Sequence, residues 1–157
     1  MEHKDFVLRL RELKACPEAI DFVAQHRYSF KEAGETCERA DWMLWYIFRA
    51  GMGTKRDRIH LVCDCASTAL KYVPKGEDRP RKAIEATRKY ADNPTEENRV
   101  AAHAAAYVAH VAYAAANAAA AAAAAAATAV YAAKKQAHIK MCNMIRKKVG
   151  KLRWKLR

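Results

Sequence analysis

The chain has 157 residues, a net charge of +12 and five cysteines. This length favours a single domain that can bury a real core. An odd number of cysteines favours reduced thiols over a disulfide framework, and the acidic residues near the start leave no secretory signal.

The charge is distributed unevenly along the chain. Residues 1–133 contain 19 Lys or Arg and 17 Asp or Glu, whereas residues 134–157 contain ten Lys or Arg and no acidic residue. The body is therefore nearly neutral and the C-terminal segment is polycationic. This asymmetry indicates an acidic partner: nucleic acid, anionic lipid or an acidic protein face.

Two short amphipathic helices are predicted at the start of the chain. Residues 5–15 carry Phe6 and Leu10 at helical spacing. Pro17 then opens a second helix, in which Ile20 and Val23 are expected to face inward.

A third helix is predicted from the capping box Ser29–Glu32 to about Ala50, where glycines follow. It contains residues 41–48, the most apolar short run in the chain. A helix that is apolar on nearly all sides is normally buried, so we expect this run to form the core, with a binding surface as the alternative.

Two further helices are predicted before the alanine-rich half. Thr54 can cap a fourth helix to about Val73, and Pro80 opens a fifth that ends by Asp92-Asn93. The side chains expected to face inward on the fourth helix are Ile59, Val62, Ala66, Ala69 and Val73.

The rest of the chain predicts one long helix. Residues 93–96 read Asn-Pro-Thr-Glu, a start signal with Asn93 as N-cap, and 23 of the 33 residues from Ala101 to Ala133 are alanine. Unbroken to Gly150, the helix would be roughly 80 Å long at ~1.5 Å per residue. We expect an all-α fold with about five shorter helices packed on this helix. Residues 1–149 then form one helical domain (1–92 the body, 93–149 the long helix), and 150–157 form a basic tail.

The long helix carries a line of polar side chains. His103, His110 and Asn117 repeat every seven residues, so they lie in one sector. Either they form hydrogen bonds at the margin of the helix packing, or they bind a partner. The partner-binding candidates are His103, His110, Tyr113 and Asn117. The two histidines lie about 10 Å apart along the axis, too far to share one metal ion. These polar residues, and the near-neutral transfer energy of alanine, also disfavour a membrane span.

One short segment contains residue types that bind metals or act as nucleophiles. His60 and Cys63 share a helix face, but Cys65 points about 160° away from Cys63. One helix therefore cannot present all three to a zinc ion, and nothing in the sequence marks an oxyanion hole or a group that orients His60. We expect no metal, no cofactor and no enzymatic activity.

The basic C-terminal segment is amphipathic. The residues on one side of the helix are apolar: Ile139, Cys142, Ile145, Val149, Leu152 and Leu156. The residues opposite are Lys140, Lys147, Lys148, Lys151 and Lys155. Three interpretations stay open: docking of a helix end by its apolar side, contact with phosphates, and attachment to a membrane surface. The candidate residues for binding nucleic acid or another anion are Lys140, Arg146, Lys147, Lys148, Lys151, Arg153, Trp154, Lys155 and Arg157.

Three segments carry a resemblance to a known family. They are Cys37–Trp45, which contains Asp-Trp-x-Leu-Trp, Cys63–Ala66, and Val73–Ala86, which contains Arg-Pro-x-x-Ala-Ile-Glu. Together with the alanine-rich half, over residues 6–135, they resemble a bacterial and phage family of immunity proteins. The basic tail departs from the family's pattern.

The resemblance implies an α-helical protein. It would bind and neutralise a toxin or, in a phage, a host defence factor. The cysteine count separately favours a cytoplasmic location, which is the host cytoplasm if a phage encodes the chain. The alternative is a nucleic-acid-binding protein that uses the basic C-terminal segment. The sequence does not identify the oligomeric state.

Overall fold

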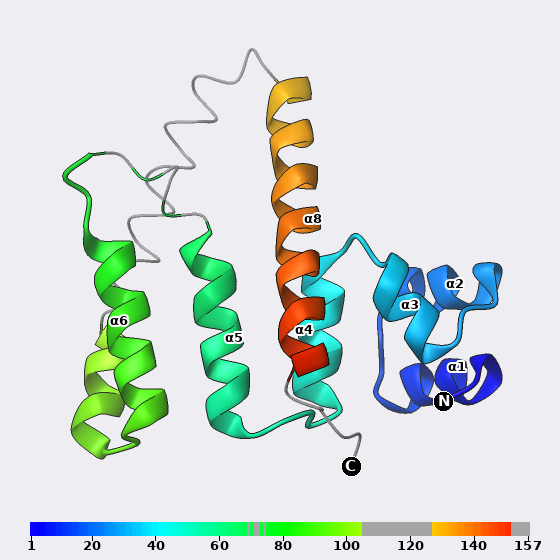
Figure 1. Ribbon diagram of the computed structural model, residues 1–157, viewed down its shortest axis with the longest axis horizontal. Helices are drawn as coiled ribbons and strands as arrows, with labels where there is room; N and C mark the ends of the chain where they lie inside the picture. The colour runs from blue at the N-terminus through cyan, green and yellow to red at the C-terminus, as the bar shows by residue number, and fades with distance from the viewer. Residues whose placement is uncertain (69, 71–72, 74, 105–126, 152–157) are drawn as a thin grey trace. The chain divides into compact units, whose positions relative to one another are not determined.

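The protein is all-helical in the part of the chain that the structure describes (Figure 1). The structure, a computed structural model, describes residues 1–68, 70, 73, 75–104 and 127–151, without the side chains of 127–134 and 151. The helices are α1 (His3–Glu12), α2 (Pro17–His26), α3 (Phe30–Thr36), α4 (Ala40–Arg49), α5 (Lys55–Ser67), α6 (Arg79–Asp92) and α8 (Ala127–Lys151). The all-α prediction is confirmed.

The chain divides into two compact units. Unit 1 combines Met1–Gly53 with His138–Arg157, and unit 2 is Thr54–Ala137. Segments from opposite ends of the sequence therefore build unit 1. The predicted division into a body, a long helix and a tail stays a prediction.

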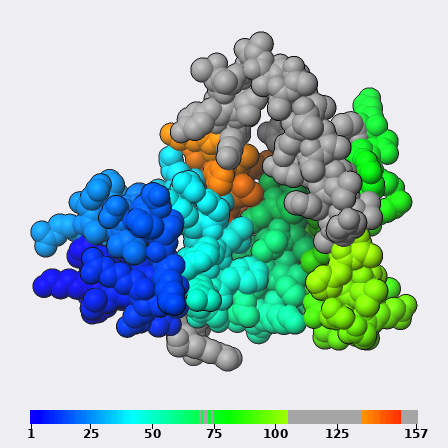
Figure 2. Space-filling view, turned by 180° about the vertical axis from the view of Figure 1, so that it is seen from behind, coloured from blue at the N-terminus to red at the C-terminus, as the bar shows by residue number. Residues whose placement is uncertain are grey.

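An aromatic cluster holds α1, α3 and α4 of unit 1 together. The ring of Phe6 meets those of Phe30 and Tyr46 edge-on, at centroid distances of 5.3 and 5.5 Å. Edge-to-face pairs of this kind add to the free energy gained from burying the rings. In the space-filling view, residues of α1 to α4 (blue to cyan) form one continuous body (Figure 2).

The predicted third helix is two helices in the structure. The capping box at Ser29 and Glu32 is confirmed, but α3 ends at Thr36 and α4 begins at Ala40. In an unbroken helix the carbonyl of Gly34 would accept a bond from residue 38. Here it accepts a hydrogen bond from Arg146 Nε of α8, 2.7 Å away, so the prediction of one helix to Ala50 is wrong.

The expectation that residues 41–48 are core is correct only in part. Tyr46 and Ile47 are buried, but Trp42 and Trp45 are half-buried and Phe48 is exposed. A run that is apolar on every side has more apolar surface than the neighbouring helices of a small unit can cover. The side chains left over form part of a surface.

In unit 2, α5 and α6 lie side by side (Figure 1). Thr54 caps α5 as predicted, and its box is completed by Asp57. However, α5 ends at Ser67 rather than near Val73. The hydroxyls of Ser67 and Thr68 donate to the carbonyls of Cys63 and Cys65 at this end.

The predicted inward face of α5 is wrong at two positions. Val62 and Ala66 are exposed, whereas Leu61, Cys63 and Cys65 are buried. Cysteine thiols pack as small apolar groups, so Cys63 and Cys65 can occupy the inward face of α5. Ile59 and Val73 are half-buried, and Ala69 lies outside the described residues.

The long helix is described only at its two ends. Residues 96–104 and 127–151 are helical, and 105–126 lie outside the described residues, so the continuity of the helix and the packing of the shorter helices on it stay predictions. Its N-cap is Thr95 instead of Asn93. The Thr95 hydroxyl accepts from the amide of Asn98 at 3.2 Å, while the amide of Asn93 is still bonded to Lys89 in α6.

Candidate functional site

Unit 1 contains an apolar cavity of about 750 Å³. We call it the unit 1 cavity. Its walls come from α1, α2, α3, α4 and α8. Ligand pockets in proteins have volumes of about 300 to 1,000 Å³ and mostly apolar walls, so this volume suffices for a bound group. Its aromatic lining residues are Phe6, Phe22, Phe30, Trp42, Trp45 and Tyr46.

The two tryptophans of α4 lie at the cavity because of their phase on the helix. Trp42 lies one turn before Tyr46 on the same face of α4, and Trp45 lies three residues after Trp42. All three line the cavity, Tyr46 as a buried side chain and the two tryptophans as half-buried ones. Tryptophan is enriched among the residues that contribute most of the binding free energy at protein interfaces.

A charged pair stands beside Trp42 in the cavity wall. Arg39 holds both oxygens of Asp41, at 2.9 Å from Nε to Oδ1 and 2.6 Å from Nη2 to Oδ2. The same guanidinium lies 4.5 Å from the centroid of the Trp42 ring. The hydrogen bonds from Arg39 lower the pKa of Asp41 below its ordinary value. This side of the cavity therefore combines an aromatic face with a fixed ion pair.

The helix α8 is attached to α3 and α4 by two side chains. Arg146 donates to the carbonyls of Gly34 and Cys37 and, at 2.7 Å, to Asn143 Oδ1. His138 Nδ1, which is buried and makes no hydrogen bond to another described residue, lies 3.6 Å from Asp41 Oδ1. Between them, Ile145 is fully buried and lines the cavity.

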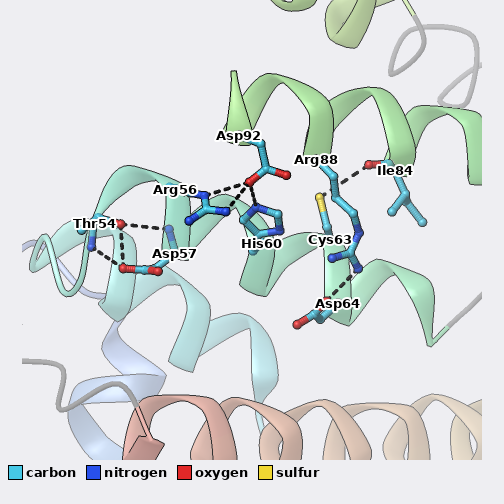
Figure 3. A network of polar contacts seen from close by, with 9 residues as sticks. All are labelled: Thr54, Arg56, Asp57, His60, Cys63, Asp64, Ile84, Arg88 and Asp92. Carbon is cyan, nitrogen blue, oxygen red and sulfur yellow. Dashed lines mark hydrogen bonds and ion pairs between the residues drawn. The ribbon is translucent and has the colours of Figure 1, made fainter. Parts of the chain in front are cut away.

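A second cluster of polar side chains joins α5 and α6 in unit 2 (Figure 3). Asp92 Oδ1 accepts a hydrogen bond from Arg56 Nε at 2.8 Å and lies 2.9 Å from His60 Nε2. These contacts lower the pKa of Asp92. Asp92 is thus a group that orients His60, which the sequence did not reveal.

The thiol of Cys63 makes a separate contact. It points to the carbonyl of Ile84, 3.9 Å away, and burial raises its pKa (Figure 3). A buried thiol with a raised pKa is a poor nucleophile. Nearby, Arg88 pairs with Asp64 at 2.7 Å. These side chains therefore link the two helices: Asp92 of α6 contacts Arg56 and His60 of α5, and Arg88 of α6 pairs with Asp64 of α5.

No three histidine, cysteine or acidic side chains lie together as a metal ion requires, within the described ranges. The same part of the chain contains no helix that is both long enough and apolar enough to cross a bilayer.

The predicted partner-binding residues fall mostly outside the described part of the chain. His103 is exposed, in the helical residues 96–104. His110, Tyr113 and Asn117 lie outside the described residues.

The predicted anion-binding residues separate into three groups. Lys140 and Lys147 are exposed on α8, Arg146 and Lys148 are half-buried, and the side chains of Lys151, Arg153, Trp154, Lys155 and Arg157 lie outside the description. Sequence reasoning treated all of these as one set, and it missed that Arg146 binds the carbonyls at the end of α3.

The cavity residues of α1 to α3 were not predicted as a site. Each helix shows only an ordinary apolar stripe, and the one local signal was the run 41–48, whose apolar side chains exceed a single buried face. Comparison of the chain with protein-family models, with curated proteins and with solved structures finds no match.

Proposed function

We propose that this protein is a non-enzymatic inhibitor of the immunity-protein type, which binds a partner protein and blocks it. The partner is a bacterial toxin or, if a phage encodes the chain, a host defence factor. The observation that carries the proposal is the unit 1 cavity, with Trp42 and Trp45 half-buried in its wall. Concave apolar surfaces with such anchors bind protein side chains.

Two further observations support a binding role. The segments Cys37–Trp45, Cys63–Ala66 and Val73–Ala86 resemble immunity proteins, and the first of them forms part of the cavity wall. In addition, His60 and Cys63 make separate packing contacts with α6.

The test is site-specific cross-linking followed by an inhibition assay. A photoreactive amino acid replaces Trp45 in the tagged full chain, and in a matched control it replaces Leu8, which is 56% exposed and does not line the cavity. We expect one protein to be cross-linked at position 45 and not at position 8. The purified chain should then abolish the activity of that protein at a one-to-one ratio.

A point variant makes the test quantitative. Trp45→Ser should raise the concentration needed for inhibition about 30-fold, the effect of losing an anchor worth about 2 kcal/mol, and Leu8→Ser should leave it unchanged. The proposal fails if the chain captures no specific protein from bacterial cells while nucleic acid co-purifies. It also fails if the captured protein keeps its activity when saturated with the chain.

A further inference from the structure

The solvent-facing side of α8 carries a line of polar residues at helical spacing. Lys140, Asn143 and Lys147 are exposed, three and four residues apart. We call these three residues the α8 stripe. Cys142 and Ile145 lie between them in sequence and are 0% exposed, so they occupy the opposite side. The described part of α8 thus has one buried apolar side and one basic side.

The lysines of the α8 stripe lack the acidic partners that several other cations of the chain have. Lys82 is 2.8 Å from Asp78, and Arg88 is 2.7 Å from Asp64. Lys140 and Lys147 form no ion pair with any other described residue, and residues 134–157 contain no carboxylate side chain that could approach along the helix. Their charge is left for a partner outside the chain.

Arg146, which precedes Lys147 in the sequence, makes contacts of a different kind. Its guanidinium donates to two carbonyls at the end of α3 and to Asn143, and its side chain is half-buried. It is therefore part of the attachment of α8 within unit 1. The structure thus separates cations that the sequence presents as one cluster.

The burial of the apolar side indicates which kind of polyanion fits. A helix that attaches to a membrane surface inserts its apolar side among the lipids. In α8 the residues that would be inserted, Cys142 and Ile145, are fully buried within the protein. The exposed side chains of α8 between residues 140 and 147 are Lys140, Asn143 and Lys147, and lysine charge is the basis of binding to a phosphate backbone.

The residue types and their spacing point to contact with phosphates and not with bases. Lysine presents a compact point charge, which suits phosphate oxygens, whereas the forked donors of arginine or a free amide give more directional contacts to base edges. Asn143 already accepts a hydrogen bond from Arg146. Lys140 and Lys147 lie about 10 Å apart along the helix axis, so they can reach different phosphates.

We propose that the α8 stripe binds the phosphate backbone of nucleic acid without reading its sequence, through Lys140 and Lys147. This inference is independent of the proposed inhibition, since it uses another surface and another partner. The nucleic acid supplies the phosphates, whether it is DNA or RNA.

The salt dependence of binding tests this proposal. The full chain is titrated into labelled duplexes of about 30 base pairs, two unrelated DNA sequences and one RNA, at about 50 to about 200 mM KCl. We expect similar affinities for the two DNA sequences. The slope of log K against log salt is negative. The double variant Lys140→Gln/Lys147→Gln should make it less steep by about 1.8, because each lost phosphate contact removes about 0.9 from its magnitude.

The matched control removes the same charge elsewhere. Lys31→Gln/Lys82→Gln takes away two exposed lysines that are paired with Glu35 and Asp78, and it should leave the slope unchanged. The inference is overturned if the two double variants have the same slope. Binding of both duplex types supports phosphate recognition, and binding of RNA alone identifies RNA as the source of the phosphates.

Two more measurements can overturn the assignment. Arg146→Gln, measured at a temperature where circular dichroism shows it folded, should keep the parental slope, and a loss as large as that of the lysine variant contradicts the separation of roles. Vesicles of phosphatidylcholine with about 30% phosphatidylserine should bind more weakly than DNA at equal phosphate concentration. Tighter binding to the vesicles would assign the stripe to membranes instead.

Discussion

At the scale of single residues, the identity of a side chain did not decide its role. Arg146 and Lys147 are neighbours in a basic segment, and the sequence alone makes them equivalent candidates for binding an anion. In the structure, Lys147 is exposed and Arg146 bonds to carbonyls at a helix end more than one hundred residues away in sequence. No local pattern contains that information, because it depends on which helix packs beside which.

The role of Arg146 leads to a prediction about stability. Arg146→Gln removes the charged donor from two carbonyls at the end of α3, and a hydrogen bond to a charged group is worth about 1.5–3 kcal/mol. We expect the free energy of unfolding, from urea titration, to fall by about 2 kcal/mol. Lys147→Gln, on the exposed side of α8, should change it by less than about 0.5 kcal/mol. Equal effects of the two substitutions would show that Arg146 does not hold α8 in place.

At the scale of elements, helix starts could be predicted and some helix ends could not. Pro17, the box at Ser29 and Thr54 are local signals, and each lies at the start of a helix in the structure. Arg146 bonds to a carbonyl at the end of α3, and the hydroxyls of Ser67 and Thr68 bond to carbonyls in the last turn of α5. The contact at the end of α3 comes from a helix that is distant in the sequence, and hydrophobic periodicity does not mark the last turn of α5. A prediction from periodicity alone therefore made both helices too long.

The two capping boxes give the prediction at this scale. Ser29→Ala and Thr54→Ala each remove a side chain that accepts the amide of the third helical residue. Each should lower the free energy of unfolding by about 1 kcal/mol. The matched control is Thr87→Ala, because the Thr87 hydroxyl bonds only to the carbonyl of Ala83 within α6. That substitution should be neutral or slightly stabilising, since alanine has the higher helix propensity. A loss at Thr87 as large as at Ser29 would mean that the boxes contribute nothing specific.

At the scale of the whole molecule, the two units illustrate why a site is harder to predict than a fold class. The all-α class follows from helical periodicity and alanine content, which any window of the sequence displays. The unit 1 cavity is enclosed by α1 to α4 and by α8, whose residues come from the two ends of the chain. Part of its wall comes from residues 138–151, which pack beside the N-terminal helices. In the sequence, the apolar side of this segment, with Cys142 and Ile145, was the one feature that indicated such packing.

The charged contacts of both units predict how stability depends on pH. Hydrogen bonds from Arg39 lower the pKa of Asp41 in unit 1, and those from His60 and Arg56 lower the pKa of Asp92 in unit 2. In the unfolded chain these values return to about 3.9, so the folded protein binds fewer protons in acid. The stabilisation is therefore fully present above the unfolded pKa and is lost as the pH falls through the lower, folded pKa.

The urea midpoint should accordingly drop between about pH 5 and about pH 2. Asp41→Asn isolates the contribution of unit 1, because it removes the carboxylate that Arg39 binds. The variant should be less stable than the parent at neutral pH, and the difference should shrink toward zero in acid, where the parent's Asp41 is also uncharged. A difference that stays constant over this range would mean that Asp41 acts through its shape and hydrogen bonds and not through its charge.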